Sequence, residues 1–330
     1  MKSDAPYIMS IEDLRVLYNT TYGLVRAVDG FSMYARPGEM IGICGPSGCG
    51  KTTSFLTLLG IARGVPGVVS GKATYRGQDL LADLGNYVQR ETTSGGDIIK
   101  KDFVGWDKHY AAMIEPYLST DLYMVFQEPR QSLDPYLKVG EQLLRVLSET
   151  GGLSGKQRTE KAESLLRRLG FRNPGATCDK YSFQLSGGEC QRFVLAIALA
   201  IQPKVIIADE LTNGVDYGTQ VLLFEVLRQE MREREVTVIL ISHELVTLVS
   251  QCDSIVFFDG STTCEIMPKA KILEKDFRQS HPTTIHLIQD AFNIQLPVRV
   301  AEPENGEPLD SRPEQLRRIG EGHWVLGDRS

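Results

Sequence analysis

The chain has 330 residues, of which 42% are hydrophobic and 24% are charged, and its formal net charge is −6. This composition excludes a mainly disordered chain, and the length allows one large domain or two ordinary ones. The negative net charge argues against a surface dedicated to nucleic acid. The six cysteines show neither a CxxC pair nor a metal-ligand spacing, which is typical of a protein kept in a reducing cytosol.

The sequence contains no segment that predicts membrane insertion. The first residues, MKSDAPYIMSIEDL, lack the charged and apolar regions of a signal peptide. The longest apolar stretch, residues 193–201, is far shorter than the roughly 20 residues that a membrane-spanning helix needs. We therefore expect any role at a membrane to depend on a partner.

The first predicted elements are short strands separated by glycine and proline, over residues 11–18, 24–28 and 40–44. A helix is expected to begin near Lys51. Residues 86–120 are polar, contain glycine and show no clear periodicity, which favours an inserted loop or short helices.

The second half of the chain alternates helices with short apolar runs. Residues 139–169 are rich in helix signals, and a further helix is predicted over 219–234. On either side of that helix, residues 204–208 and 236–241 are β-branched runs typical of buried parallel strands. This alternation predicts an α/β sheet.

The segment Gly45-Pro-Ser-Gly-Cys-Gly-Lys-Thr52 matches the phosphate-binding pattern GxxxxGK[ST] between a predicted strand and a predicted helix. Its glycines let backbone N–H groups and the helix N-terminus approach phosphate closely. Lys51 would neutralise the β- and γ-phosphates, and the Thr52 hydroxyl would bind Mg²⁺. A plain glycine-rich turn is the weaker alternative in this context. The predicted nucleotide-binding residues are Gly45, Pro46, Ser47, Gly48, Cys49, Gly50, Lys51, Thr52 and Thr53.

Two adjacent carboxylates, Asp209 and Glu210, follow a predicted buried strand. A P-loop enzyme needs a carboxylate at the end of a neighbouring strand to hold Mg²⁺, and Asp209 stands at such a place. Glu210 would then be free to orient or deprotonate the attacking water. The alternative, a solvated turn, is disfavoured by the P-loop earlier in the chain.

Five motifs occur in one order: the P-loop, Gln127 in FQEP, LSGG at residues 185–188, Asp209-Glu210, and Ser242-His-Glu244. In this order the chain resembles the nucleotide-binding subunits of ABC transporters over roughly residues 8–265. The resemblance implies an α/β fold of the RecA-like P-loop NTPase type. Its predicted parts are an ATP-binding domain over 1–265, with a helical subdomain at roughly 130–190 and an insertion at roughly 86–120, and an extension over 266–330.

The resemblance also implies how two such subunits share ATP. They form head-to-tail dimers in which each ATP lies between the P-loop of one chain and the LSGG segment of the other. Ser186, Gly187 and Gly188 would therefore bind the γ-phosphate of the partner's ATP at a helix N-terminus. Asp216 matches the aspartate of the loop that crosses to the partner.

The remaining catalytic roles are carried over from the same resemblance. Glu210 would be the general base, and His243 would contact the γ-phosphate as a neutral imidazole. Gln127 would contact Mg²⁺ or the water and lie where a membrane subunit docks. Taken without the resemblance, a histidine in the position of His243, at the end of a strand, is more often structural.

An aromatic residue near the end of the first strand stacks on adenine in this family. Tyr18 has the expected spacing, and Tyr22 is its rival. Either residue could instead pack in the core as an ordinary strand aromatic, so the choice between them stays open here.

Several stretches resemble the branch of importers for oligopeptides, dipeptides and nickel: residues 27–30, 126–135, 139–143, 281–288 and 313–323. The resemblance implies an ATPase that powers import of peptides or a related small solute. Its implied partners are a second ATPase chain, either a paralogue or a copy of itself, and two transmembrane permease subunits. An extracytoplasmic binding protein would act indirectly, and the implied location is peripheral, on the cytoplasmic face of the cytoplasmic membrane.

The chain also departs from this branch. After about Ile266 it becomes rich in proline and charge, which we interpret as a separate extension or a loosely ordered tail. Residues 265–330 contain no cysteine, so we expect no Fe–S cluster of the kind that many members carry there. Leu211 replaces the usual proline, and Asn213-Gly-Val215 also departs from the usual residues, in a stretch expected to face the partner chain. The insertion at 86–120 either tunes contact with a membrane subunit or is a tolerated surface loop.

Two other functions are compatible with the same motifs. One is an ATP-binding cassette in a soluble complex without a transport role, which the peptide-branch segment near the C-terminus disfavours. The other is a regulatory subunit that binds ATP with little turnover, which the intact Lys51, Asp209, Glu210, Ser186 and His243 disfavour. A nucleic-acid ATPase of the same superfamily lacks support, because there is no basic arm or second cassette.

Overall fold

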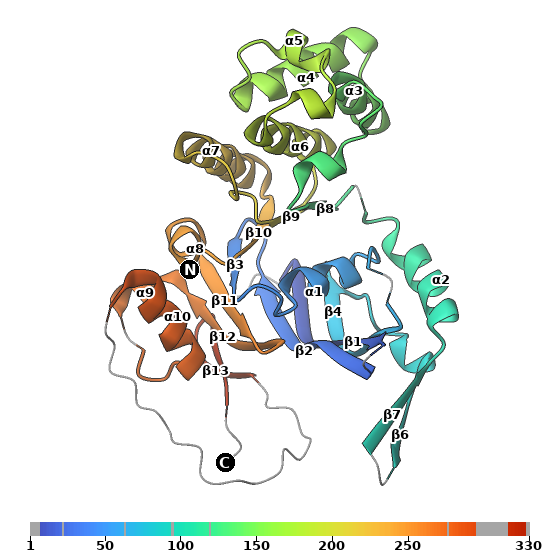
Figure 1. Cartoon of the computed structure of the whole chain (residues 1–330), viewed down its shortest axis with the longest axis vertical. Helices are drawn as coiled ribbons and strands as arrows, with labels where there is room; N and C mark the ends of the chain where they lie inside the picture. The colour runs from blue at the N-terminus through green and yellow to red at the C-terminus, as the bar shows by residue number, and fades with distance from the viewer. Residues whose placement is uncertain are drawn as a thin grey trace. The chain divides into compact units, whose positions relative to one another are not determined.

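The structure is a computed structural model that describes residues 7–21, 23–62, 64–93, 96–118, 120–275, 277–294 and 316–327. These residues form two compact units (Figure 1). Unit 1 is drawn from residues 1–36, 40–115 and 242–330, and unit 2 from residues 37–39 and 116–241.

The first sheet of unit 1 is antiparallel, with the strand order β2-β1-β4-β5. Its strands are β1 (Met9–Thr20), β2 (Gly23–Ala35), β4 (Pro66–Tyr75) and β5 (Gln78–Asp79). Ile11, Leu14 and Val16 of β1 are fully buried. Burial of these apolar side chains stabilises β1 between β2 and β4. The strand predicted over residues 11–18 is therefore present.

The second sheet of unit 1 has the order β13-β14-β12-β11-β3. All five residues of β3 (Met40–Cys44) are buried, and β3 runs parallel to β11 (Ser254–Asp259). β11 pairs antiparallel with β12 (Thr262–Pro268). The helices of this part are α8 (Leu245–Gln251), α9 (Lys269–Glu274) and α10 (Pro282–Phe292).

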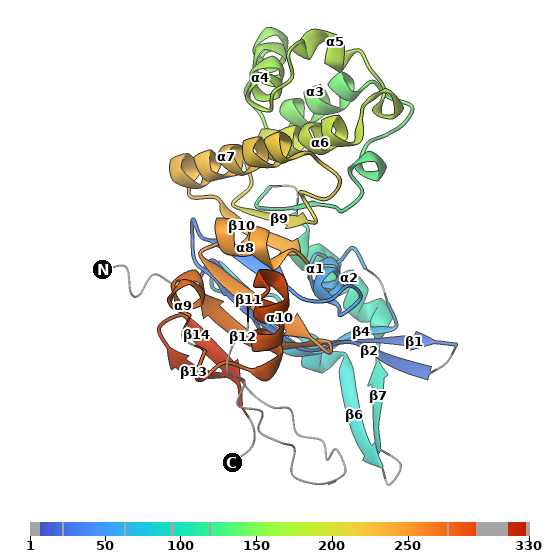
Figure 2. The ribbon, with the colours of Figure 1, turned by 60° about the vertical axis from the view of Figure 1, so that its left-hand side comes forward.

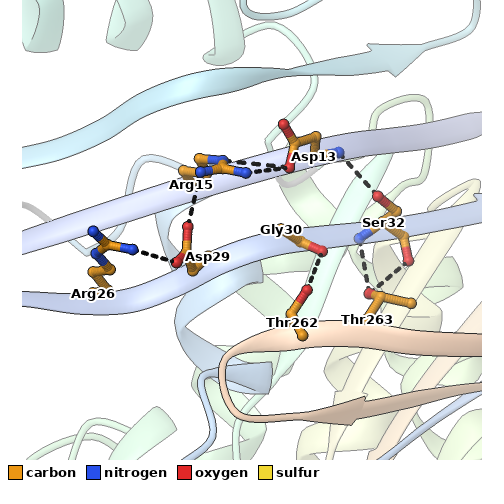
Figure 3. Close-up of polar contacts among 8 residues, drawn as sticks. All are labelled: Asp13, Arg15, Arg26, Asp29, Gly30, Ser32, Thr262 and Thr263. Atoms are coloured by element: carbon orange, nitrogen blue, oxygen red, sulfur yellow. Dashed lines mark hydrogen bonds and ion pairs between the residues drawn. The ribbon is translucent and has the colours of Figure 1, made fainter. Parts of the chain in front are cut away.

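β2 joins the two sheets of unit 1 (Figure 3). The Ser32 N–H donates to Thr263 Oγ1 at 2.9 Å, and Thr263 Oγ1 donates to the Ser32 carbonyl at 3.1 Å. On the other side, Ser32 Oγ accepts from the Asp13 N–H of β1 at 2.9 Å. β2 is therefore hydrogen-bonded to both sheets, which fixes the position of one sheet against the other within unit 1.

Helix α1 (Lys51–Leu58) follows β3 and packs on the β1–β2–β4 sheet. Phe55 of α1 makes an edge contact with Phe31 of β2, with ring centroids 5.5 Å apart. Phe31 also contacts Phe258 of β11 at 5.3 Å. All three rings are buried, so this cluster holds the helix that follows the P-loop against both sheets.

The insertion contains a β-hairpin, which the sequence analysis did not predict. β6 (Val88–Thr93) pairs with β7 (Gly96–Lys101), and α2 (Phe103–Ile114) follows; the hairpin extends away from the first sheet of unit 1 (Figures 1 and 2). The prediction of loop or short helices was correct only for α2 and the one-turn helix η1 (Leu84–Asn86). The available signal was the β-branched residues on both sides of the glycine pair 95–96.

The C-terminal residues differ from the expected separate extension. β14 (His323–Leu326) pairs with β12 and with β13 (Leu316–Gly320), so residues 316–327 add two strands to the second sheet of unit 1. Residues 295–315 lie outside the described part of the chain. The domain boundary at residue 265 therefore stays a prediction.

Unit 2 contains three parallel strands and a group of helices. The strands have the order β10-β9-β8 and are β8 (Leu122–Val125), β9 (Val205–Asp209) and β10 (Thr237–Ser242). The helices are α3 (Val139–Glu149), α4 (Gly155–Arg168), α5 (Pro174–Cys178), α6 (Gly187–Ile201) and α7 (Tyr217–Arg234), with the short helices η2 (Pro129–Ser132) and η3 (Ser182–Gln184). Residues 190–200 of α6 are all buried except Arg192, which makes α6 the centre of the helical part.

The predicted strands at 204–208 and 236–241 and the predicted helix at 219–234 are all present in unit 2. None of the helices in the described ranges combines the length and apolar character that crossing a bilayer requires.

Candidate nucleotide-binding site

The P-loop of unit 1 follows β3 and ends where α1 begins. A Cβ atom at Gly45 would come 1.9 Å from the Phe258 carbonyl oxygen, and one at Gly50 would come 2.3 Å from that of Ala27. Gly50 also has φ 106°, in the region that favours glycine. Only residues without side chains fit at these two positions. The backbone can therefore form a tight cradle of the kind that holds phosphate.

Lys51 occupies the first position of α1 and is 7% exposed. Its Nζ donates to the carbonyl oxygens of Gly45 and Pro46 at 2.8 and 2.7 Å. The ammonium is thus folded onto the loop itself. Since both acceptors are neutral, the positive charge is available to an anionic ligand.

Cys49 lies inside the same loop. Burial raises the pKa of its thiol above the ordinary value, and this effect exceeds the opposing influence of the Lys51 charge. The thiol donates to the Phe258 carbonyl at 3.7 Å. Cys49 is therefore a neutral packing residue of the loop rather than a thiolate nucleophile.

Tyr18 lies on β1 in unit 1 and is partly buried. Its hydroxyl is 3.2 Å from Thr57 Oγ1 on α1, so the ring is attached to the helix that begins at Lys51. Tyr22, its rival for contact with adenine, lies outside the described residues.

His243 follows β10 and precedes α8, and its side chain is exposed. The Ser242 hydroxyl accepts from the Glu244 N–H at 3.0 Å, which stabilises the turn on which His243 stands. The imidazole is thus presented at the end of a buried strand on a structured turn.

In unit 2, Asp209 is the last residue of β9 and is 3% exposed. Glu210 follows with φ 51°, a backbone conformation that is uncommon for residues other than glycine. Its N–H donates to the Ile241 carbonyl of β10 at 2.9 Å, and its carbonyl accepts from the Asn213 N–H at 3.0 Å. These two backbone bonds hold the turn that carries Glu210.

The residues after Glu210 divide into a buried and an exposed part. Leu211 is 3% exposed, so the expectation that it faces a partner chain is wrong for this residue. Asn213 and Gly214 are exposed, and Gly214 has φ 70° with no atom near its missing side chain.

The LSGG segment forms the start of α6. The Ser186 hydroxyl accepts from the Glu189 N–H at 3.2 Å, and the Glu189 carboxylate accepts from the Ser186 N–H at 2.9 Å. This capping box starts the helix at Gly187. The bond to the Ser186 N–H, with the Lys180 charge, holds the pKa of Glu189 below its ordinary value.

Two neighbours of the LSGG segment in unit 2 were not predicted. Arg130 donates from its guanidinium to the Leu185 carbonyl at 2.7 Å, which ties the segment after the exposed Gln127 to the residue before Ser186. A Cβ at Gly188 would lie 3.6 Å from Val215 Cγ1, which places the 213–216 loop beside the signature. These contacts join residues far apart in the sequence, so no local pattern could reveal them.

Asp216 caps α7, accepting from the Thr219 N–H at 3.0 Å and from the Thr219 hydroxyl at 2.7 Å. These bonds lower the pKa of its carboxyl. A capping role accounts for this aspartate within the single chain.

The candidate residues are thus contributed by both units. The P-loop, Tyr18 and His243 belong to unit 1. Gln127, the LSGG segment, Asp209, Glu210 and Asp216 belong to unit 2. Within each unit, the candidate site residues lie at or near the ends of strands or at helix N-termini.

A P-loop between a buried strand and a helix, with carboxylates at the end of a second strand, defines a nucleotide-binding α/β protein of the P-loop type. The profile of the ABC transporter family matches residues 28–213. The chain therefore belongs to the ABC transporter family, and it is an ABC-type ATPase by family and fold. The family resemblance and the fold class predicted from the motifs are both confirmed.

Relatives with described functions match most of the chain. The oligopeptide transport ATP-binding protein of Salmonella typhimurium is 30% identical over 86% of this chain and 76% of its own length. That of Escherichia coli is 28% identical over 97% of this chain and 85% of its own. The dipeptide transport ATP-binding protein of Bacillus subtilis is 29% identical over 92% and 82%.

Solved structures agree on the fold. A dimeric ATP-binding cassette, MJ0796, bound to ADP and Pi, has a TM-score of 0.62 and 20% identity, covering 79% of this chain and 98% of that one. The cassette cbiO1 of Clostridium perfringens has a TM-score of 0.60 and 20% identity, covering 87% and 96%.

Proposed function

We propose that this chain is the subunit that binds and hydrolyses ATP to power a peptide-type ABC importer. The observation that carries ATP binding is the P-loop cradle, in which Gly45 and Gly50 exclude side chains and Lys51 is folded onto the loop. The names and coverage of the relatives support the peptide branch. Binding of the substrate would depend on other proteins of the transporter.

The residues proposed for Mg²⁺ are Thr52, Gln127 and Asp209. Hydroxyl, amide and carboxylate oxygens are the hard donors that suit this ion, so the donor chemistry fits. When bound, Mg²⁺ would neutralise charge on the phosphate oxygens of ATP.

Glu210 is proposed to take a proton from the attacking water on its carboxylate. His243 is proposed to hold the γ-phosphate, and Lys51 to neutralise charge on the β- and γ-phosphates. The structured turns that carry Glu210 and His243 support these roles, because a catalytic side chain needs a fixed backbone.

The proposed assembly contains a second ATPase chain, a paralogue or a copy of this one, and two transmembrane permease subunits. Ser186, Gly187 and Gly188 would bind the ATP held by the partner's P-loop, and Asp216 would lie in the loop that crosses to it. The start of α6 at Gly187 supports the first role, since a helix N-terminus favours anions. The proposed location is peripheral, on the cytoplasmic face of the cytoplasmic membrane.

The decisive variant is Glu210→Gln, which keeps the shape of the side chain and removes the base. We expect ATP turnover to fall by about 100-fold or more, while ATP still binds and accumulates in a stable dimer of cassettes. Turnover is measured by phosphate release and dimer formation by size-exclusion chromatography, with the partner ATPase present. Glu235→Gln is the matched control, because Glu235 is exposed and has a similar φ of 54°.

Unchanged turnover in Glu210→Gln would remove Glu210 from the role of base. Co-purification from detergent-solubilised membranes tests the transport assembly separately. Recovery of the chain with two multi-span proteins and a second ATPase supports the importer, whereas recovery only in a soluble complex contradicts it.

A further inference from the structure

The ring of Tyr18 is held at two points of unit 1 that no sequence motif predicts. Tyr18 pairs with Val25 of β2 and with Pro66 of β4, so its backbone is fixed in the middle of a sheet. Its hydroxyl lies 3.2 Å from Thr57 Oγ1. An edge of its ring lies against Gly64, where a Cβ atom would come 1.8 Å from Cε1 and 2.1 Å from Cδ1.

The direction of the hydrogen bond between the two hydroxyls can be assigned. Thr57 Oγ1 donates its single proton to the Thr53 carbonyl at 2.7 Å. The hydroxyl of Tyr18 must therefore donate to Thr57, which is 6% exposed. Since Thr57 is buried and already bonded to its own helix, it is a rigid attachment point for the ring.

This attachment point belongs to the helix that carries the P-loop lysine. Thr57 follows Lys51 by six residues on α1, which corresponds to about 9 Å along the helix axis. The bond from Tyr18 thus sets the ring at a fixed distance from the start of α1, where the phosphates are proposed to bind.

The ring is also bordered by exposed apolar side chains. Val25, directly across from Tyr18, is 46% exposed, and Val65, next to Gly64 in the chain, is 43% exposed. The Val65 carbonyl accepts from the Asn19 N–H at 2.6 Å, which holds the segment around Gly64 beside β1. A partly exposed aromatic residue with exposed apolar residues next to it along the sheet is suited to a planar aromatic ligand such as a nucleobase.

We propose that Thr57 and Gly64 are positioning residues that set the Tyr18 ring as the stacking surface for the adenine base of ATP. Thr57 fixes the hydroxyl end of the ring, and Gly64 leaves the space that the ring edge occupies. Neither residue is proposed to touch the nucleotide. This inference rests on the proposed function, because it assumes that ATP binds at the P-loop.

The first test is Gly64→Ala. The φ of Gly64 lies outside the region that only glycine favours, so alanine fits the backbone and the Tyr18 ring must move. We expect the Kd for ATP to rise about tenfold, within the range for loss of base stacking. The Kd for inorganic tripolyphosphate, which has no base, should not change. Both are measured by titration calorimetry on the full chain, with Gly85→Ala as control because a Cβ there meets no atom within 4 Å.

The second test is a double-variant cycle of Thr57→Val and Tyr18→Phe. Each removes one side of the same hydrogen bond, so each should weaken ATP binding by about three- to tenfold, and the double variant by no more than either alone. A purely structural role of Thr57 in α1 would instead weaken tripolyphosphate binding to the same extent.

The outcomes separate this inference from the proposed function. If the wild-type chain binds tripolyphosphate but not ATP, or neither, the proposed function fails and the inference with it. If Tyr18→Ala weakens ATP binding but Gly64→Ala and Thr57→Val do not, Tyr18 contacts the base without the two positioning residues, and the inference is overturned. An equal loss of ATP and tripolyphosphate binding in these variants also overturns it.

Discussion

Individual residues of the P-loop show why some positions tolerate a single residue type. Gly45 approaches the Phe258 carbonyl so closely that any side chain would displace β11 or the loop. The Lys51 ammonium donates to two carbonyls of the loop itself. The P-loop predicted from the sequence has the expected backbone shape in the structure, because the pattern GxxxxGK[ST] specifies a backbone shape as well as a set of side chains.

The sequence does not indicate that Lys101 is a partly buried lysine with a lowered pKa. Its Nζ donates to the Val68 carbonyl at 2.6 Å and lies 5.3 Å from the centre of the Trp106 ring. Burial lowers the pKa of Lys101 to about 8. The neighbouring Lys100 is instead exposed and bonded to Glu91 at 2.9 Å.

The lowered pKa of Lys101 predicts a rise in stability at alkaline pH. The unfolded chain, with a lysine pKa of about 10.4, binds more protons than the folded chain between pH 8 and that value, so the free energy of unfolding should increase over this range. We expect the rise due to Lys101 to be about 1 kcal/mol, after allowance for its remaining exposure to solvent. Urea unfolding at pH 7.5 and 9.5 should show the rise in wild type and in Lys100→Met, but not in Lys101→Met. A rise retained in Lys101→Met would contradict this assignment.

At the scale of elements, one buried carboxylate connects the C-terminal strands to the rest of unit 1. Glu265 of β12 is fully buried, accepts from the His281 N–H at the start of α10 at 3.0 Å, and lies 2.6 Å from His323 Nε2 of β14. Next to this pair, Trp324 stacks on Tyr34 of β2 with ring centroids 4.8 Å apart. Strand pairing, a buried polar bond and a ring contact thus attach β14 to the body of the unit.

Removal of the imidazole should loosen this attachment. In His323→Leu, Glu265 loses a partner without gaining access to water, so we expect the free energy of unfolding to fall by about 2 kcal/mol. His286→Leu is the matched control, because His286 is exposed on α10. Urea denaturation followed by circular dichroism measures the change. Equal stability of the two variants would show that Glu265 does not depend on His323.

At the scale of the whole molecule, the proposed phosphate and metal ligands come from different units. Thr52 and the P-loop belong to unit 1, and Asp209 belongs to unit 2. A variant of Asp209 therefore tests the contribution of unit 2 to the proposed metal site.

The effect of Mg²⁺ on ATP binding should depend on Asp209. At 100 times its Kd a ligand stabilises a protein by about 2.7 kcal/mol, which corresponds to a rise in Tm of about 4 °C for a chain of this size. We expect wild type and Asp290→Asn, an exposed control on α10, to show a larger rise with ATP and Mg²⁺ than with ATP and EDTA. In Asp209→Asn this difference should disappear, while the rise with ATP and EDTA remains. A difference that persists would exclude Asp209 as a ligand of the ion.

The sequence by itself determined the class of the protein and the starts of several of its main elements. The P-loop, the LSGG segment and the strand before Asp209 are local patterns, in which backbone conformation and chemistry depend on neighbouring residues. For the same reason the predicted starts of α1 and α7 lie within two residues of the observed ones.

Only the tertiary structure decided which distant residues support these motifs. The contacts of Tyr18 with Thr57 and Gly64, of Arg130 with Leu185, and of Glu265 with His323 join positions about 40 to 60 residues apart. The hairpin β6–β7 and the strands at the C-terminus likewise depend on pairing partners rather than on local propensity. Local patterns thus specify where phosphate chemistry takes place, whereas side chains brought together by folding decide how the groups around that chemistry are held.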